Sequence, residues 1–121
     1  MTAVVLAAVL AASPSFVFGR EGGNVVPMRA AIYPGGRVVV NGQPGRHLTR
    51  AKVTALRRYA AAQGFAQIPR RIECPGVLPD VATLYVRVRS GSRVRTVTEH
   101  GGCNKRFNRV YAALAKAVGE P

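Results

Sequence analysis

Acidic side chains are scarce in this chain, which has five Asp and Glu residues against 18 Lys and Arg. The five are Glu21, Glu73, Asp80, Glu99 and Glu120. The formal net charge of +13 predicts attraction to polyanions such as nucleic acid, acidic wall polymers or anionic lipid head groups. The sequence shows no convergent acid–base set and no zinc-finger, helix-turn-helix or RNA-binding signature, so it indicates no enzyme class and no specific nucleic-acid motif. The basic residues are scattered, and abundant Arg, Ala, Gly, Val and Pro also fit a GC-rich genome, so the charge does not identify the polyanion.

Cysteine is scarcer still, with Cys74 and Cys103 as the two instances. Zinc sites pair their ligands at short spacing, and this long separation does not fit them, so we expect no metal and no cofactor. We expect a Cys74–Cys103 disulfide, which contributes roughly 3–4 kcal/mol when it closes a loop of about 30 residues. The alternative is a reactive Cys103 with His100 upstream and Asp80, and with His47 as a further group, but nothing in the spacing specifies that geometry.

Charge is also missing from residues 2–19, which contain an Ala/Val/Leu core between residues 3 and 12. This pattern is typical of the apolar region of a secretory signal, although no Lys or Arg lies near Met1. We expect a signal peptide over residues 1–19, with Ala11, Ser13 or Gly19 as the last removed residue, and a single domain over residues 20–121. The alternative is a buried N-terminal helix. Export to the exterior or cell envelope agrees with a disulfide, and we expect no transmembrane segment in the mature chain.

Two hairpins and two helices are predicted along the rest of the chain. Alternating apolar residues and intervening turns indicate strands over residues 25–33 and 37–41, and again over 82–89 and 93–99. Apolar stripes and capping residues predict helices over 50–63 and 105–118, with Thr49 and Asn104 as N-caps. Residues 65–80 contain three prolines and are expected to form a long connection. The order ββαββα predicts a two-layer α+β fold, in which two helices cover one face of a four-stranded antiparallel sheet.

The turn of the second hairpin decides where its arginines lie. A three-residue loop over residues 90–92 places Arg87, Arg89, Arg93 and Arg95 together on the solvent-facing side of the sheet. A two-residue turn at Gly91 and Ser92 moves arginines onto the apolar side, so the three-residue loop is preferred. The resulting cluster is a candidate polyanion-binding surface, and a solvated outer face is the alternative interpretation.

A second candidate for polyanion binding lies at the start of the final predicted helix. Lys105, Arg106 and Arg109 are in its first turns, where positive charge is unfavourable to the helix dipole. This misfit suggests that an anion binds there.

Four segments carry a resemblance to known proteins: Y-P-G-G-R-V, a helix ending G-F-A-Q-I-P, C-P-G followed by P-D-V-A-T, and R-T-V followed by H-G-G-C-N-K-R-F. Over most of residues 30–118, the chain resembles small secreted domains of unknown function from GC-rich Gram-positive bacteria. The shared features are turns, caps and the cysteine pair. The resemblance therefore implies an exported small domain and brings no catalytic residues.

Three functions are compatible with these features. The first is a non-enzymatic binding module that holds a protein or cell-envelope polymer; a secreted inhibitor with residues 75–79 as its projecting loop is a special case. The second is polyanion binding through the arginine-rich sheet face. The third is an enzyme built on Cys103, His100 and Asp80. We rank them in this order, because the sequence shows no acid–base set.

Overall fold

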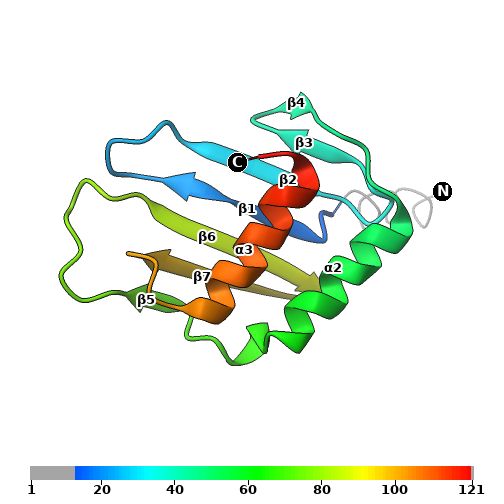
Figure 1. Ribbon diagram of the computed structural model, residues 1–121. Helices are drawn as coiled ribbons and strands as arrows, with labels where there is room; N and C mark the ends of the chain where they lie inside the picture. The colour runs from blue at the N-terminus through cyan, green and yellow to red at the C-terminus, as the bar shows by residue number, and fades with distance from the viewer. Residues whose placement is uncertain (1–12, 121) are drawn as a thin grey trace.

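The computed structural model describes residues 13–120, which form an α+β domain of one mixed sheet and two long helices. The elements, in chain order, are β1 (Phe16–Glu21), β2 (Met28–Ile32), β3 (Val38–Val40), β4 (Gln43–Pro44), α2 (Arg50–Ala62), the 3-10 turn η1 (Phe65–Gln67), β5 (Arg71–Glu73), β6 (Thr83–Ser90), β7 (Arg93–His100) and α3 (Lys105–Val118). Both helices cross the same face of the sheet (Figure 1). No helix within residues 13–120 has both the length and the apolar character needed to cross a membrane.

The sheet is larger than the expected four-stranded antiparallel sheet, so that prediction is wrong. It has seven strands in the order β4-β3-β2-β1-β6-β7-β5. Neighbouring strands are antiparallel except β5, which runs parallel to β7 and makes the sheet mixed. The additional strands are β1, β4 and β5. The first begins in the expected leader, the second has only two residues, and the third lies in the proline-rich connection.

Strand β1 lies at the centre of the sheet. It pairs with β2 on one side and with β6 on the other, and Phe16 and Phe18 are fully buried. The expected boundary between residues 19 and 20 falls inside β1. The domain therefore includes residues that the sequence analysis assigned to the leader. Residues 1–12, the apolar part of the expected signal peptide, lie outside the described residues.

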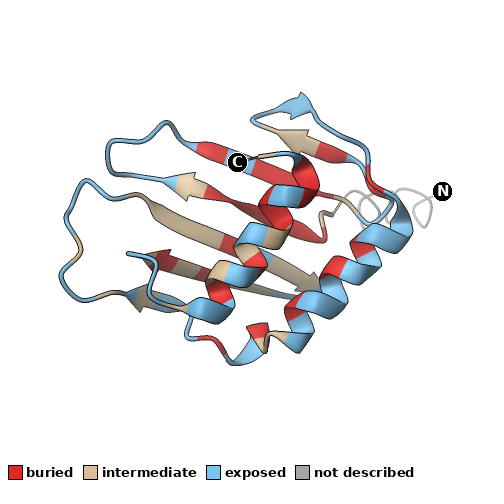
Figure 2. Ribbon diagram, viewed as in Figure 1, coloured by how far each residue is buried: buried red, intermediate tan, exposed pale blue. Residues whose placement is uncertain are grey.

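The core lies between the sheet and the two helices (Figure 2). The apolar stripe of α3 contributes Phe107, Val110 and Leu114, and the narrower stripe of α2 contributes Val53 and Leu56. These residues follow the 3.6-residue period of a helix, which is why local pattern alone located them.

The helix boundaries confirm the predicted caps. The side chain of Thr49 accepts a hydrogen bond from the amide of Lys52, and that of Asn104 accepts one from the amide of Phe107. Gly119 ends α3 with a φ of 82°, a conformation that favours glycine.

The predicted disulfide is confirmed: Cys74 and Cys103 are bonded, with 5.8 Å between their Cα atoms. It joins the end of β5 to the segment that leads into α3. Gly101 lies against this bond with a φ of +118°, and a Cβ at this position would collide with the side chains of Val77 and Cys74. Glycine is therefore required where the two segments meet.

Candidate anion-binding groove

The β6–β7 hairpin has a two-residue turn at Gly91 and Ser92, so the expected three-residue loop is wrong. Ser90 pairs with Arg93, and Val88 pairs with Arg95. Gly91 has a φ of 62°, which the tight turns of hairpins require. This register places Val97 opposite Val86, where both are fully buried under the helices. Burial of that valine pair offsets the cost of moving two arginines to the helix side.

The four hairpin arginines consequently do not share one face. Side chains alternate along each strand, so Arg87 and Arg89 lie on the open face, whereas Arg93 and Arg95 lie on the helix side. Arg87 donates from Nε to Oγ1 of Thr96 at 3.3 Å, within that open face. The predicted single arginine-rich face is therefore divided between the two sides of the hairpin.

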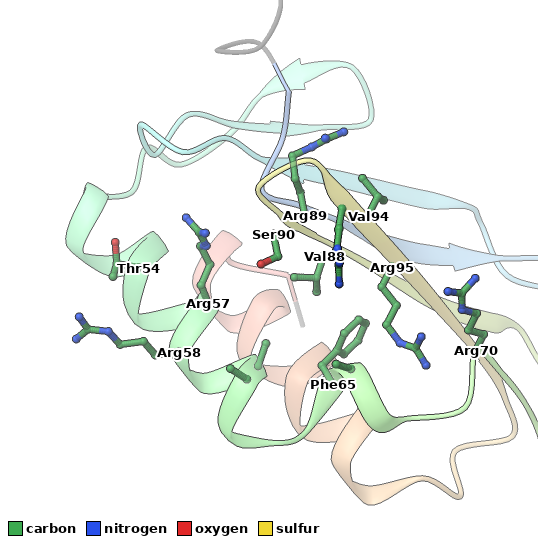
Figure 3. Close-up of a pocket in the computed structure, with 14 residues that line it drawn as sticks. Thr54, Arg57, Arg58, Phe65, Arg70, Val88, Arg89, Ser90, Val94 and Arg95 are labelled. Atoms are coloured by element: carbon green, nitrogen blue, oxygen red, sulfur yellow. The ribbon is translucent and has the colours of Figure 1, made fainter.

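A groove of about 930 Å³ lies between α2 and the turn end of the hairpin (Figure 3). Six arginines from three parts of the chain line it: Arg57, Arg58, Arg70, Arg89, Arg93 and Arg95. Its apolar lining includes Phe65, Ala60 and Val88. Figure 3 shows Arg57 extending upward from α2 and Arg95 lying beside Phe65, whereas Arg58 and Arg89 point away from the centre.

The positive charge of the groove is not neutralised by neighbouring carboxylates. No Asp or Glu lines it, and the ion pairs found within residues 13–120 join Glu73 to Arg71 and to His100. Each of the six arginines therefore lacks a described carboxylate within ion-pairing distance. Like charges that converge without compensation are destabilising, and a bound anion would relieve this repulsion.

Arg95 is held in place by the backbone beneath the groove. Its Nη2 donates to the carbonyl of Ile68, which follows η1. The Nε atoms of Arg95 and Arg89 are buried without a hydrogen-bond acceptor among the described residues. Buried donors usually have partners, so the two guanidinium groups have unused hydrogen-bonding capacity at the hairpin.

The other predicted cluster, at the start of α3, lies outside the groove lining. Arg109 donates from Nη1 to Oε1 of Gln63 at 3.4 Å, and Arg106 lies beside Gly64, so both reach toward the C-terminal end of α2. Lys105 is exposed in the first turn. The structure does not bring these residues together with the hairpin arginines in one groove.

The helix terminus itself is complemented from inside the protein. Glu99 is fully buried, and its Oε2 accepts a hydrogen bond of 2.8 Å from the amide of Asn104, the N-cap of α3. The carboxyl group of Glu99 therefore already accepts a hydrogen bond from the N-cap amide, at the position where the sequence suggested an external anion.

Burial raises the pKa of Glu99, and the hydrogen bond from Asn104 opposes that rise. The pKa of Glu99 is therefore higher in the folded protein than in the unfolded chain. As pH rises from the unfolded pKa to the folded pKa, the unfolded chain loses its proton first, and the unfolding free energy falls. We expect Glu99→Gln to reduce the loss of unfolding free energy as pH rises above the ordinary Glu pKa of about 4.3, measured by urea denaturation. An unchanged pH profile in this variant would show that Glu99 does not carry the effect.

The catalytic site that the sequence analysis considered as an alternative, built on the thiol of Cys103, is not formed. Both cysteines are in the disulfide, so Cys103 offers no thiol. His100 contacts Oε2 of Glu73 through Nδ1 at 3.3 Å and the carbonyl of Val81 through Nε2 at 3.0 Å. Within residues 13–120, no group of three or more His, Cys, Asp or Glu side chains is placed to hold a metal ion.

The projecting loop near the disulfide exposes apolar side chains. Leu78 is 65% exposed, and Val26, on the neighbouring β1–β2 loop, is 78% exposed. The two loops are joined by a hydrogen bond of 3.0 Å from the amide of Asn24 to the carbonyl of Asp80. The inhibitor hypothesis for residues 75–79 stays a prediction, because exposure alone does not identify a partner.

Sequence reasoning missed three of the six groove arginines, namely Arg57, Arg58 and Arg70. Arg57 and Arg58 lie off the apolar stripe of α2, which indicates exposure but gives no sign of what they face. Arg70 precedes β5, which sequence reasoning assigned to a connection. Their approach to the hairpin depends on tertiary packing.

Comparison with family models, curated proteins and solved structures finds no match to this chain. The resemblance to small secreted domains of Gram-positive bacteria therefore stays a prediction. The groove is interpreted from its geometry and charge.

Proposed function

We propose that the protein is an exported, non-enzymatic binding module that holds an anionic polymer in the arginine groove. The observation that carries this proposal is that six arginines from α2, the β5 approach and the hairpin line one groove, with no carboxylate among its described lining residues. Guanidinium groups bind phosphate, sulfate and carboxylate through paired hydrogen bonds, so this lining suits a polymer with repeated anionic groups.

The alternative is a solvated basic surface without a ligand. Exposed arginines on such surfaces gain little from one another and are usually dispersed or paired with carboxylates. Here, Arg95 is fixed by the carbonyl of Ile68, and arginines from α2 and from the approach to β5 line the same groove. A guanidinium group held in place before binding lowers the entropy cost of capturing a ligand, and the position of Arg95 therefore supports binding over simple solvation.

Removal of groove charge is expected to weaken polyanion binding more than removal of the same charge elsewhere. The groove variant combines Arg57→Gln, Arg70→Gln and Arg93→Gln. The control combines Arg87→Gln, Lys105→Gln and Arg109→Gln, and either set lowers the net charge from +13 to +10 because three positive charges are removed. Arg95 is left intact because it bonds the backbone.

The measurement is the affinity for long-chain polyphosphate and for heparin over a series of salt concentrations. We expect the groove variant to reduce the slope of log affinity against log salt by up to about three, and the control to leave it near that of the unaltered protein. Equal losses in the two variants would show that net charge alone governs binding and that the groove is not the site.

A further inference from the structure

Strand β5 forms one edge of the sheet, and its outer side has no strand partner among residues 13–120. On its inner side, the carbonyl of Arg70 accepts from the amide of Thr98, and the amide of Cys74 donates to the carbonyl of His100, each at 2.9 Å. Backbone direction alternates along a strand, so Ile72 also faces β7. The amide and carbonyl groups of Arg71 and Glu73 therefore point outward.

This free edge is short, and it carries one positive and one negative side chain at equal distances from its centre. Pro69 and Pro75 stand at equal distances from Ile72 and limit any added pairing, because proline has no amide hydrogen to donate. Arg71 and Glu73 are one residue to either side of Ile72, and their side chains lie on the same sheet face, joined at 3.2 Å. A twofold rotation about Ile72 exchanges the positive position for the negative one.

We propose that β5 pairs antiparallel with β5 of a second copy of this chain, about a twofold axis at Ile72. In this register, Arg71 lies opposite Glu73 of the partner subunit, and Glu73 lies opposite Arg71 of the partner subunit. The outward backbone groups of these residues then form four hydrogen bonds, as in the closely spaced pairs of an antiparallel ladder. Two cross-strand ion pairs accompany them.

The charge distribution favours a second copy as the occupant of this edge. The strand carries one positive and one negative side chain in a self-complementary order, which suits an isologous interface. Glu73, one of only five acidic residues, lies on this strand beside Arg71, so the charges of the strand itself balance although each chain carries a net charge of +13. A strand from an unrelated protein is not expected to carry the complementary order of positive and negative side chains.

A twofold axis perpendicular to the sheet keeps the helix layers of both copies on the same side of one continuous sheet. The two arginine grooves then also lie on that side. A long polyanion could engage both grooves, which raises its overall affinity through effective concentration. This consequence rests on the proposed function, whereas the dimer itself does not.

Charge-swap variants test the register. Arg71→Glu places Glu opposite Glu across the axis, and Glu73→Arg places Arg opposite Arg, so each single variant should dimerise at least about tenfold more weakly. The double variant, Arg71→Glu with Glu73→Arg, restores opposite charges and should dimerise about as well as the unaltered chain. A mixture of the two single variants should form heterodimers, because both cross-strand pairs are then attractive.

The measurement is sedimentation equilibrium over a range of protein concentrations, with circular dichroism as the check that every variant is folded. A backbone control is Arg71→Pro, which removes an outward amide hydrogen and should abolish dimerisation while β7 pairing persists. If the unaltered protein stays monomeric at all concentrations, β5 is a charged, blocked edge and the proposal is overturned. Dimerisation that is equally strong in all charge-swap variants would place the interface elsewhere and would also overturn the proposal.

Discussion

A chain that begins at Arg20 is expected to remain unfolded, although this start lies at the boundary that the sequence indicated. Such a chain loses Phe16, Val17 and Phe18, which are all buried in the centre of the sheet. Burying each large apolar side chain contributes about 1.5–3 kcal/mol, and a whole domain is stable by only about 5–15 kcal/mol. The truncation also removes the strand that joins β2 to β6, so the sheet is divided into two parts.

The matched control is a chain that begins at Ser13 and keeps all of β1. We expect it to show a cooperative thermal transition and a near-ultraviolet circular dichroism signal, both absent from the shorter chain. If the protein is exported, its intact mass should place the mature N-terminus at or before Ser15, which fits removal after Ala11 or Ser13 and not after Gly19. A cooperative transition in the chain that begins at Arg20 would show that β1 is dispensable.

The helices could be predicted closely because their signals are local. The apolar stripe and the Asn104 cap gave residues 105–118 for α3, which are the observed bounds Lys105–Val118. For α2, the predicted range of 50–63 differs from Arg50–Ala62 by one residue. Caps and stripes act within a few residues, so a single sequence contains them.

The central strand could not be recognised for a physical reason. Both faces of β1 are buried, so the run from Phe16 to Gly19 shows no alternation of apolar and polar residues. A short apolar run next to an Ala/Val/Leu segment has the same pattern as the end of a secretory signal. Strand β5 was missed because prolines flank it and only three residues pair with β7.

The predicted hairpin register was wrong because local sequence pattern carries no information about tertiary burial. The three-residue loop kept every arginine in solvent, which is the cheaper choice for an isolated hairpin. In the domain, the observed register buries Val97 beneath the helices and brings Glu99 to the start of α3. These gains depend on elements distant in sequence, and the arginine groove depends on the same distant contacts.

Loss of the disulfide is expected to lower the unfolding free energy by about 3–4 kcal/mol, the value for closing a loop of this size. The variant is the pair Cys74→Ser and Cys103→Ser, which are 29 residues apart with β6 and β7 between them. Cys103 is exposed and Cys74 is only partly buried, so little packing is lost. The effect therefore comes mainly from greater freedom of the unfolded chain.

For a domain of this size, such a loss corresponds to a fall in Tm of more than about 12 °C. Thermal denaturation with and without reductant separates the disulfide from the side effects of substitution. The unaltered protein should fall to the Tm of the double variant when reduced, and the double variant should not respond to reductant. An unaltered protein that gains two hydrogens in intact mass on reduction and yet keeps its Tm would contradict this account. The Cys74–Cys103 bond would then have a role other than stabilising the fold, because constraint of the unfolded chain must appear in the melting temperature.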